Sequence, residues 1–221
     1  MQSPSISSVL ARLKQGTTQL HADLEALPAM RRLVAPDLRR DEYRDLLLGF
    51  YRSTFICEEY LLQQAPLWQT LGLDWSRRLV KSAWLEADLR HLIPGFDPLK
   101  AGVPRGRRPY QGLGLASATG CLYVLEGSTL GGRVIQGLLR RAQEQPAAGA
   151  SRFFEGYGAA TGERWATLGC QLEVILGPDA EAQDHAITAA TETYLFLKAF
   201  LGDCCEGSPG AGPSVTGTAH P

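Results

Sequence analysis

The sequence lacks a strong net charge. Its 221 residues include 22 Lys and Arg against 23 Asp and Glu, a formal net charge of −1 at pH 7. This balance supplies no polybasic surface for nucleic acid or an anionic membrane. No apolar run approaches the roughly 18 uninterrupted residues of a membrane span. The N-terminal segment, MQSPSISSVLARLKQ, also lacks the apolar core of a signal peptide. We therefore expect a cytoplasmic protein that binds neither nucleic acid nor membrane.

Motifs for several common kinds of site are also missing. The five cysteines are odd in number and form no Cys-x-x-Cys, which argues against a disulfide framework or a zinc site. No pair of Glu-x-x-His motifs is present, as a di-iron helical bundle would require. The segment GLGLASATG contains a Gly-x-Gly, but no strand precedes it, so we reject a dinucleotide site.

Helical periodicity runs through nearly the whole chain. Apolar residues recur at spacings of three and four, and no β-type alternation stands out. Residues 203–221 are dominated by Gly, Pro, Ser and Thr, a composition that cannot bury enough apolar surface to offset ordering. We predict one all-α domain over residues 1–202, with about six to eight helices, and a disordered Gly- and Pro-rich tail over residues 203–221.

Proline, glycine and capping residues set the predicted helix boundaries. The segment DPLKAGVPRGRRPY, residues 97–110, is predicted to be a loop, and Asp179 is predicted to cap the last helix. The predicted helices are a first helix carrying the stripe from Leu10 to Leu24, then the stretch between Asp41 and Pro66, then 76–93, 111–145, 161–176 and 179–201.

The segment LYVLEGSTLGGRVI carries three glycines within six residues of a predicted helix: Gly127, Gly131 and Gly132. Each costs about 1 kcal/mol relative to Ala. Gly127 and Gly131 are four apart and share a face, and Gly120 extends that stripe. The bare backbone could accept another helix closely, which is the commoner case, or it could accept a flat ligand. The adjacent pair Gly131 and Gly132 could also let the helix bend.

The first helix places His21 seven residues after Lys14, hence on the same face and about 10 Å away along the axis. His21 is one of only four histidines. A neutral imidazole is a common axial ligand of heme iron, and a lysine two turns away could reach a propionate at the porphyrin rim. His91 and His185 are interpreted as helix-surface or capping residues, and His220 lies in the predicted tail. Together with the glycine helix, His21 suggests a ring held between imidazole and bare backbone.

On these residues the sequence resembles the heme oxygenase family, in particular its bacterial, phytochrome-associated branch. The resemblance rests on the Lys14 and His21 spacing with LHADLE, on YRDLLLGFYR, on GCLYVLEGSTLGGRVI and, more weakly, on FFEGYGAATGERW. It spans roughly residues 8–200 and implies a multi-helix bundle with heme between a proximal helix and a kinked distal helix.

The resemblance also implies roles for particular residues. His21 would be the proximal iron ligand. Gly127, Ser128, Gly131 and Gly132 would form the catalytic distal segment over the heme. The residues expected to bind the heme propionates are Lys14, Tyr123 and Arg164.

The implied reaction is oxidative opening of heme to biliverdin with release of CO and ferrous iron. Heme would be both substrate and cofactor. Electrons would come from a separate donor such as ferredoxin or a reductase, and a phytochrome could receive the biliverdin. Animal members of the family carry Asp where this chain has Ser128. That difference leaves open a non-catalytic heme carrier or sensor, and a third alternative is an enzyme of the same fold that acts on a small substrate other than heme.

The assignment of His21 predicts that His21→Ala abolishes the histidine-ligated spectrum of the ferric heme complex and most turnover. The measurement is hemin titration followed by visible spectroscopy. The His91→Ala and His185→Ala variants serve as controls and should keep the native spectrum. Loss of that spectrum in either control, with His21→Ala unaffected, would show that the ligand is misassigned.

Overall fold

The computed structural model describes residues 8–104, 106–112, 114–142, 145–177 and 179–202. Every regular element in these residues is a helix, which confirms the predicted all-α fold. The elements are α1 (Val9–Glu25), α2 (Pro28–Leu33), α3 (Arg40–Gln63), α4 (Ala65–Gln69), η1 (Ser76–Arg78), α5 (Lys81–Leu92), η2 (Pro98–Lys100), α6 (Leu115–Leu139), α7 (Arg152–Glu155), η3 (Gly158–Ala160), α8 (Thr161–Leu176) and α9 (Ala180–Gly202). The predicted tail, residues 203–221, lies outside the described residues, so the domain boundary stays a prediction.

The longer helices follow the predicted pattern closely. Helix α8 has the predicted bounds, and the Asp179 side chain accepts a hydrogen bond from the Ala182 amide at 3.0 Å, as expected of a cap for α9. Two predictions were too long. The helix predicted over 76–93 is divided into η1 and α5, and the helix predicted over 111–145 is α6 alone. Gly114, with φ of 94°, precedes α6 in a conformation that a right-handed helix cannot contain.

Three short helices were not predicted. They have six, five and four residues for α2, α4 and α7 respectively, too few to show a helical period. The predicted loop at 97–110 likewise contains the single turn η2. In the described part of the chain, no helix is both long and apolar enough to cross a bilayer.

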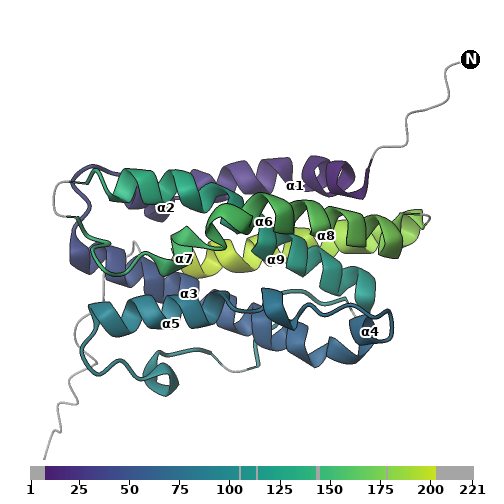
Figure 1. Cartoon of the computed structure of the whole chain (residues 1–221), viewed down its shortest axis with the longest axis horizontal. Helices are drawn as coiled ribbons and strands as arrows, with labels where there is room; N and C mark the ends of the chain where they lie inside the picture. The colour runs from purple at the N-terminus through teal and green to yellow at the C-terminus, as the bar shows by residue number, and fades with distance from the viewer. Residues whose placement is uncertain (1–7, 105, 113, 143–144, 178, 203–221) are drawn as a thin grey trace, which may run out of the picture.

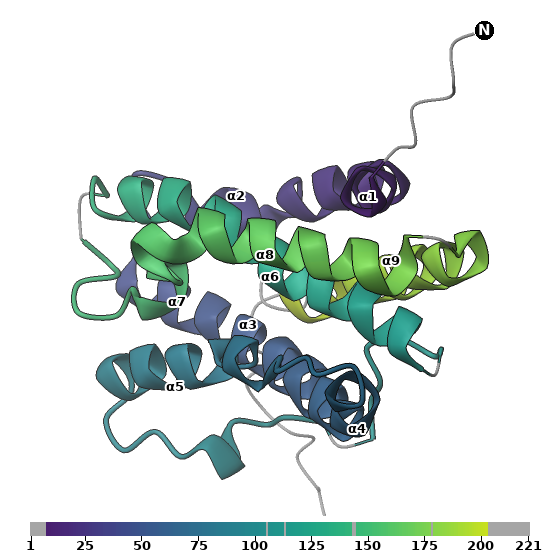
Figure 2. The same ribbon diagram turned by 45° about the vertical axis from the view of Figure 1, so that its right-hand side comes forward.

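The helices lie in three tiers, seen in Figures 1 and 2. Helices α1 and α2 form one outer tier, α3, α4 and α5 form the other, and α7, α8 and α9 lie between them. Helix α6 runs obliquely, so that its C-terminal part reaches the level of α1 and α2. The buried side chains divide into two hydrophobic clusters. One is built mainly from α1, α3, α6, α8 and α9, and the other mainly from α2, α3, α5 and α7. The boundary between these clusters is where the candidate site lies.

Buried carboxylates hold two helix starts that have no side-chain cap of their own. Glu58, only 3% exposed, accepts hydrogen bonds from the Lys81 and Ser82 amides at 2.7 and 3.1 Å and so caps α5. Asp88 accepts from the Arg152 and Phe153 amides, both at 2.9 Å, and caps α7. Burial raises the pKa of both carboxyls, although these hydrogen bonds favour the ionised form. Asp88 thereby fixes where α7 presents its aromatic side chains.

Glycine allows α6 to approach its neighbours closely at two positions. A Cβ on Gly120 would lie 2.1 Å from the Ala186 carbonyl oxygen of α9. A Cβ on Gly132 would lie 2.5 Å from the Phe154 carbonyl oxygen of α7. Both atoms belong to backbone, which cannot move aside as a flexible side chain can. The packing interpretation of the glycine stripe therefore holds at Gly120, and Gly132, which is not part of that stripe, also packs closely.

This contact predicts that Gly120→Ala destabilises the protein by about 2–3 kcal/mol, the upper range for overpacking a well-packed site. Gly137→Ala is the control, because a Cβ there meets nothing within 4 Å. It should leave stability unchanged or raise it by up to about 1 kcal/mol through helix propensity. Urea denaturation measures both free energies of unfolding. Equal effects of the two substitutions would contradict the close contact of α6 with α9.

Candidate active site

An apolar cavity opens where the two hydrophobic clusters meet. It encloses about 740 Å³ of empty space, a figure that includes open solvent at its mouth. Six helices contribute to its wall: α1, α2, α3, α6, α7 and α9. The lining residues are His21, Leu24, Glu25, Met30, Phe50, Thr54, Val124, Leu125, Gly127, Ser128, Gly131, Ile135, Phe153, Phe154, Leu197 and Leu201.

His21 supplies an imidazole to the cavity wall. Its side chain is 55% exposed, and its ring lies edge-on to Tyr194 with centroids 6.0 Å apart. The Glu25 carboxylate, one turn along α1, lies 3.6 Å from Nδ1. This is too far for a direct hydrogen bond, but a nearby carboxylate favours the tautomer with the proton on Nδ1. That tautomer leaves the Nε2 lone pair free to bind a metal.

Helix α6 supplies bare backbone to the same cavity through Gly127 and Gly131. A Cβ on Gly131 would meet nothing within 4 Å, so the space in front of this residue is open. A Cβ on Gly127 would make only ordinary contact, 3.8 Å from the Trp165 ring. Between them, the Ser128 hydroxyl donates to the Leu125 carbonyl at 2.7 Å. A cavity with a histidine, apolar walls and open space in front of a glycine backbone suits a flat, largely apolar ring such as heme.

Gly132 does not line the cavity. It is buried, and its lack of a side chain accommodates the Phe154 carbonyl. The sequence placed it with Gly127, Ser128 and Gly131 in the catalytic segment, and that role stays a prediction; in the structure Gly132 packs against α7. Its link to the site is indirect, because α7 carries Phe153 and Phe154 into the cavity wall. Helix α6 continues through Gly131 and Gly132 as a single helix, and the predicted kink there remains a prediction.

The three predicted propionate partners lie outside the cavity lining. Lys14 is exposed on α1, on the same helix as His21. Tyr123 is 7% exposed, with its ring centroid 5.7 Å from that of Trp165, and burial raises the pKa of its phenol.

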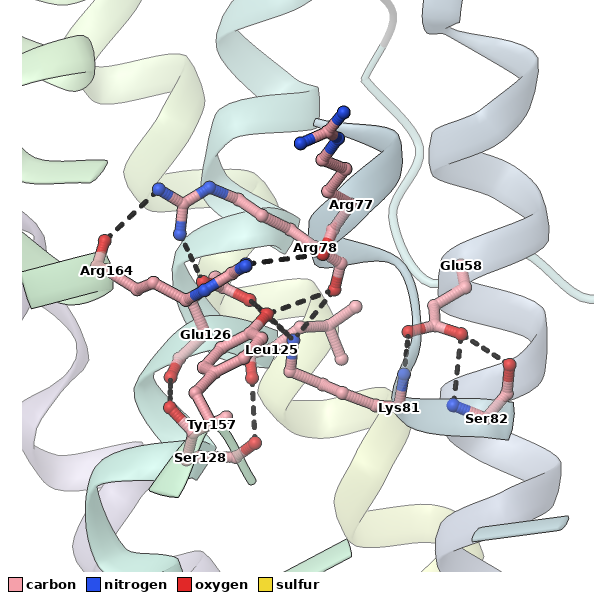
Figure 3. A network of polar contacts seen from close by, with 11 residues as sticks. Glu58, Arg77, Arg78, Lys81, Ser82, Leu125, Glu126, Ser128, Tyr157 and Arg164 are labelled. Atoms are coloured by element: carbon pink, nitrogen blue, oxygen red, sulfur yellow. Dashed lines mark hydrogen bonds and ion pairs between the residues drawn. The ribbon is translucent and has the colours of Figure 1, made fainter. Parts of the chain in front are cut away.

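The Arg164 side chain contacts residues outside the cavity. Its guanidinium lies over the Tyr157 ring, 4.3 Å from the centroid, and its Nη1 donates to the Arg77 carbonyl at 3.3 Å (Figure 3). It lines a separate hollow with Arg152. The propionate roles of Lys14, Tyr123 and Arg164 thus remain predictions. For Arg164, the side chain would have to leave its contacts with Tyr157 and Arg77 to reach a propionate.

Several residues of the site were missed by sequence reasoning. The aromatic pair Phe153 and Phe154 belongs to α7, which is too short to show a period. Met30 belongs to α2, which is also too short to show a helical period. Phe50 and Thr54 lie in the helix predicted between Asp41 and Pro66, but the apolar period of that helix does not separate cavity wall from core. Buried Glu126, beside Gly127, was given no role.

The fold and the site together define an all-α protein that presents an imidazole and a glycine backbone to one apolar cavity. The family model for heme oxygenase matches residues 7–203. The chain belongs to the heme oxygenase family.

Solved structures of similar fold include three bacterial proteins. Heme oxygenase from Leptospira interrogans is 16% identical, with a TM-score of 0.67 over 89% of this chain and 100% of that one. Heme oxygenase-1 from Synechocystis sp. PCC6803, solved in complex with heme, is 14% identical, with a TM-score of 0.68 over 89% and 92%. The NO- and CO-bound heme oxygenase from Neisseria meningitidis is 24% identical, with a TM-score of 0.68 over 92% and 95%. Among curated proteins, none matches the chain.

The open space at Gly131 predicts that Gly131→Leu weakens hemin binding at least tenfold while changing the melting temperature of the hemin-free protein little. The added side chain would occupy the cavity without meeting protein atoms. Gly137→Leu is the matched control, since a Cβ on Gly137 also meets open space but lies outside the cavity. Hemin titration and thermal denaturation measure the two effects. Equal losses of affinity in both variants would contradict the cavity assignment.

Proposed function

We propose that this protein is a heme oxygenase that opens heme to biliverdin, with release of CO and ferrous iron. The observation that carries the proposal is the single cavity shared by His21 and the α6 backbone at Gly127 and Gly131, in a chain of the heme oxygenase family. When bound, heme supplies the iron and the oxidisable ring, so it serves as both substrate and cofactor.

The protein's part is to bind, orient and shield the ring. The His21 imidazole binds iron as a neutral ligand, with Glu25 favouring the required tautomer. Phe50, Phe153 and Leu197 exclude water from the ring faces. On the α6 side, the backbone at Gly131 allows a closer approach than any side chain would permit. With the ring this close to the helix, the α6 backbone would limit the space next to the iron and direct the reaction toward the edge of the ring.

Ser128 occupies the position at which animal members carry Asp. Its hydroxyl proton is engaged by the Leu125 carbonyl, so this group offers the site only its oxygen lone pairs. We propose that ordered water and backbone carbonyls of α6 provide most of the distal hydrogen bonding. Ser128 then makes a small contribution to the reaction.

The remaining predicted contacts belong to the same proposal. Lys14 and Tyr123, with Arg164 after rearrangement of its side chain, bind the heme propionates. Electrons come from an external ferredoxin or reductase, and a phytochrome is the proposed acceptor of the biliverdin.

The test of the proposed function is the yield of biliverdin and CO from the hemin complex, supplied with ascorbate or a ferredoxin–reductase pair. We expect both products from the unaltered protein. Stable hemin binding without either product would overturn the enzyme assignment and leave a heme carrier or sensor.

The role assigned to Ser128 predicts that Ser128→Ala keeps most of the turnover rate. One neutral hydrogen bond is worth about 1 kcal/mol, which is less than tenfold in rate. Single-turnover kinetics of the hemin complex measure this rate. A loss of a hundredfold or more would instead place the Ser128 hydroxyl at the centre of the chemistry.

A further inference from the structure

A buried cluster of charges surrounds Glu126, the residue immediately before Gly127 on α6. The carboxylate is 2% exposed, and it does not line the heme cavity. Its partners Lys81 and Arg78 are 1% and 6% exposed. Figure 3 shows these side chains converging on Glu126 from the neighbouring elements. Because this buried charge cluster is one residue from the catalytic segment, it can influence the position of that segment as an exposed ion pair could not.

Glu126 joins α6 to three other segments. Its Oε2 accepts from Arg78 of η1, and its Oε1 accepts from Lys81 of α5, both at 2.5 Å. The Tyr157 hydroxyl, from the segment between α7 and η3, donates to Oε1 at 2.7 Å. Arg78 also donates through Nη2 to the Arg164 carbonyl of α8 at 3.1 Å. One carboxylate thus links α6 directly to η1, α5 and the segment after α7, and Arg78 extends the link to α8.

The cluster depends on the charge of Glu126. Burial opposes ionisation, but Lys81, the Tyr157 hydroxyl and Arg78 together outweigh it and hold the pKa of Glu126 below its ordinary value. Without this charge, two buried cations would lose the carboxylate that both of them contact. Breaking a buried pair in this way is far more disruptive than losing an exposed one.

The backbone between Glu126 and Gly132 is a continuous part of α6. It contains Gly127 and Gly131, which impose few conformational limits. The hydroxyls of Ser128 and Thr129 donate to the carbonyls of Leu125 and Glu126, both at 2.7 Å, so these side chains bond within α6 and not to a neighbouring element. At the far end, Gly132 is seated against the Phe154 carbonyl. The cavity-lining segment is therefore held at its two ends.

We propose that Glu126 is a positioning residue for the catalytic segment. Through Lys81, Arg78 and Tyr157 it fixes the position of the backbone at Gly127–Gly131, and thus the space left above the heme. It touches neither heme nor the reacting atoms. The inference rests on the proposed function for the identity of the ligand.

Azide binding to the ferric hemin complex probes this space directly, because azide is a small anion that binds iron on the side facing α6. We expect Glu126→Gln to change the azide dissociation constant at least tenfold, while the hemin dissociation constant stays within about threefold of the native value. Glu126→Asp keeps the charge and should lie between Gln and native.

Glu58→Gln is the matched control. Glu58 is equally buried, and it also contacts Lys81, but through the backbone at the start of α5. Within the described residues, the hydrogen bonds of its carboxylate go to Lys81 and Ser82 and not to α6. It should lower the melting temperature as Glu126→Gln does, yet leave azide affinity unchanged. Tyr157→Phe removes a single hydrogen bond from Glu126 and gives a milder variant should Glu126→Gln fail to fold; we expect a threefold or greater change in azide affinity.

A readout without heme completes the test. Amide hydrogen exchange at residues 125–132 of the hemin-free protein should be faster in Glu126→Gln than in Glu58→Gln. Equal exchange and equal azide affinity in the two variants, or native values of both in Tyr157→Phe, would overturn the positioning role. Absence of biliverdin from the unaltered protein would overturn the proposed function alone, since neither azide binding nor exchange requires turnover.

Discussion

The bare backbone of α6 is the constraint on which the rest of the structure depends. At Gly120 it meets the Ala186 carbonyl of α9, and at Gly132 it meets the Phe154 carbonyl of α7. Helices α9 and α7 in turn carry Leu197 and Phe153 into the cavity wall. A side chain at either glycine would push these walls away from α6. The shape of the cavity is therefore a consequence of two backbone contacts outside it.

The glycines of α6 serve different purposes although their spacing is regular. Gly120 and Gly132 permit close packing, whereas Gly131 leaves open space in the cavity. Each helical glycine lowers stability by about 1 kcal/mol relative to Ala. At Gly120 and Gly132, dense packing between helices offsets this loss. At Gly131 the missing side chain leaves room for a ligand, and this room does not stabilise the ligand-free protein.

Sequence reasoning succeeded where local patterns determine structure. The periods of α1, α3 and α8 and the cap at Asp179 follow from nearby residues, and the joint placement of His21, Gly127 and Gly131 in one cavity agrees with the resemblance. Sequence reasoning was less successful where the contacts of a residue depend on partners far away in the sequence. Glu126 looks like an ordinary helix residue until η1 and α5, more than 40 positions earlier, supply Arg78 and Lys81. Arg164 likewise donates to the carbonyl of Arg77, 87 positions earlier, a contact that no spacing rule predicts.

We propose that heme lies between His21 and the α6 backbone. A crystal structure of the protein with bound hemin is the direct test of this position. We expect iron bound to His21 Nε2, with the opposite face of the ring against the backbone of Gly127 and Gly131. Iron bound by another side chain, or a ring seated in the hollow beside Arg107 and Arg108, would contradict it.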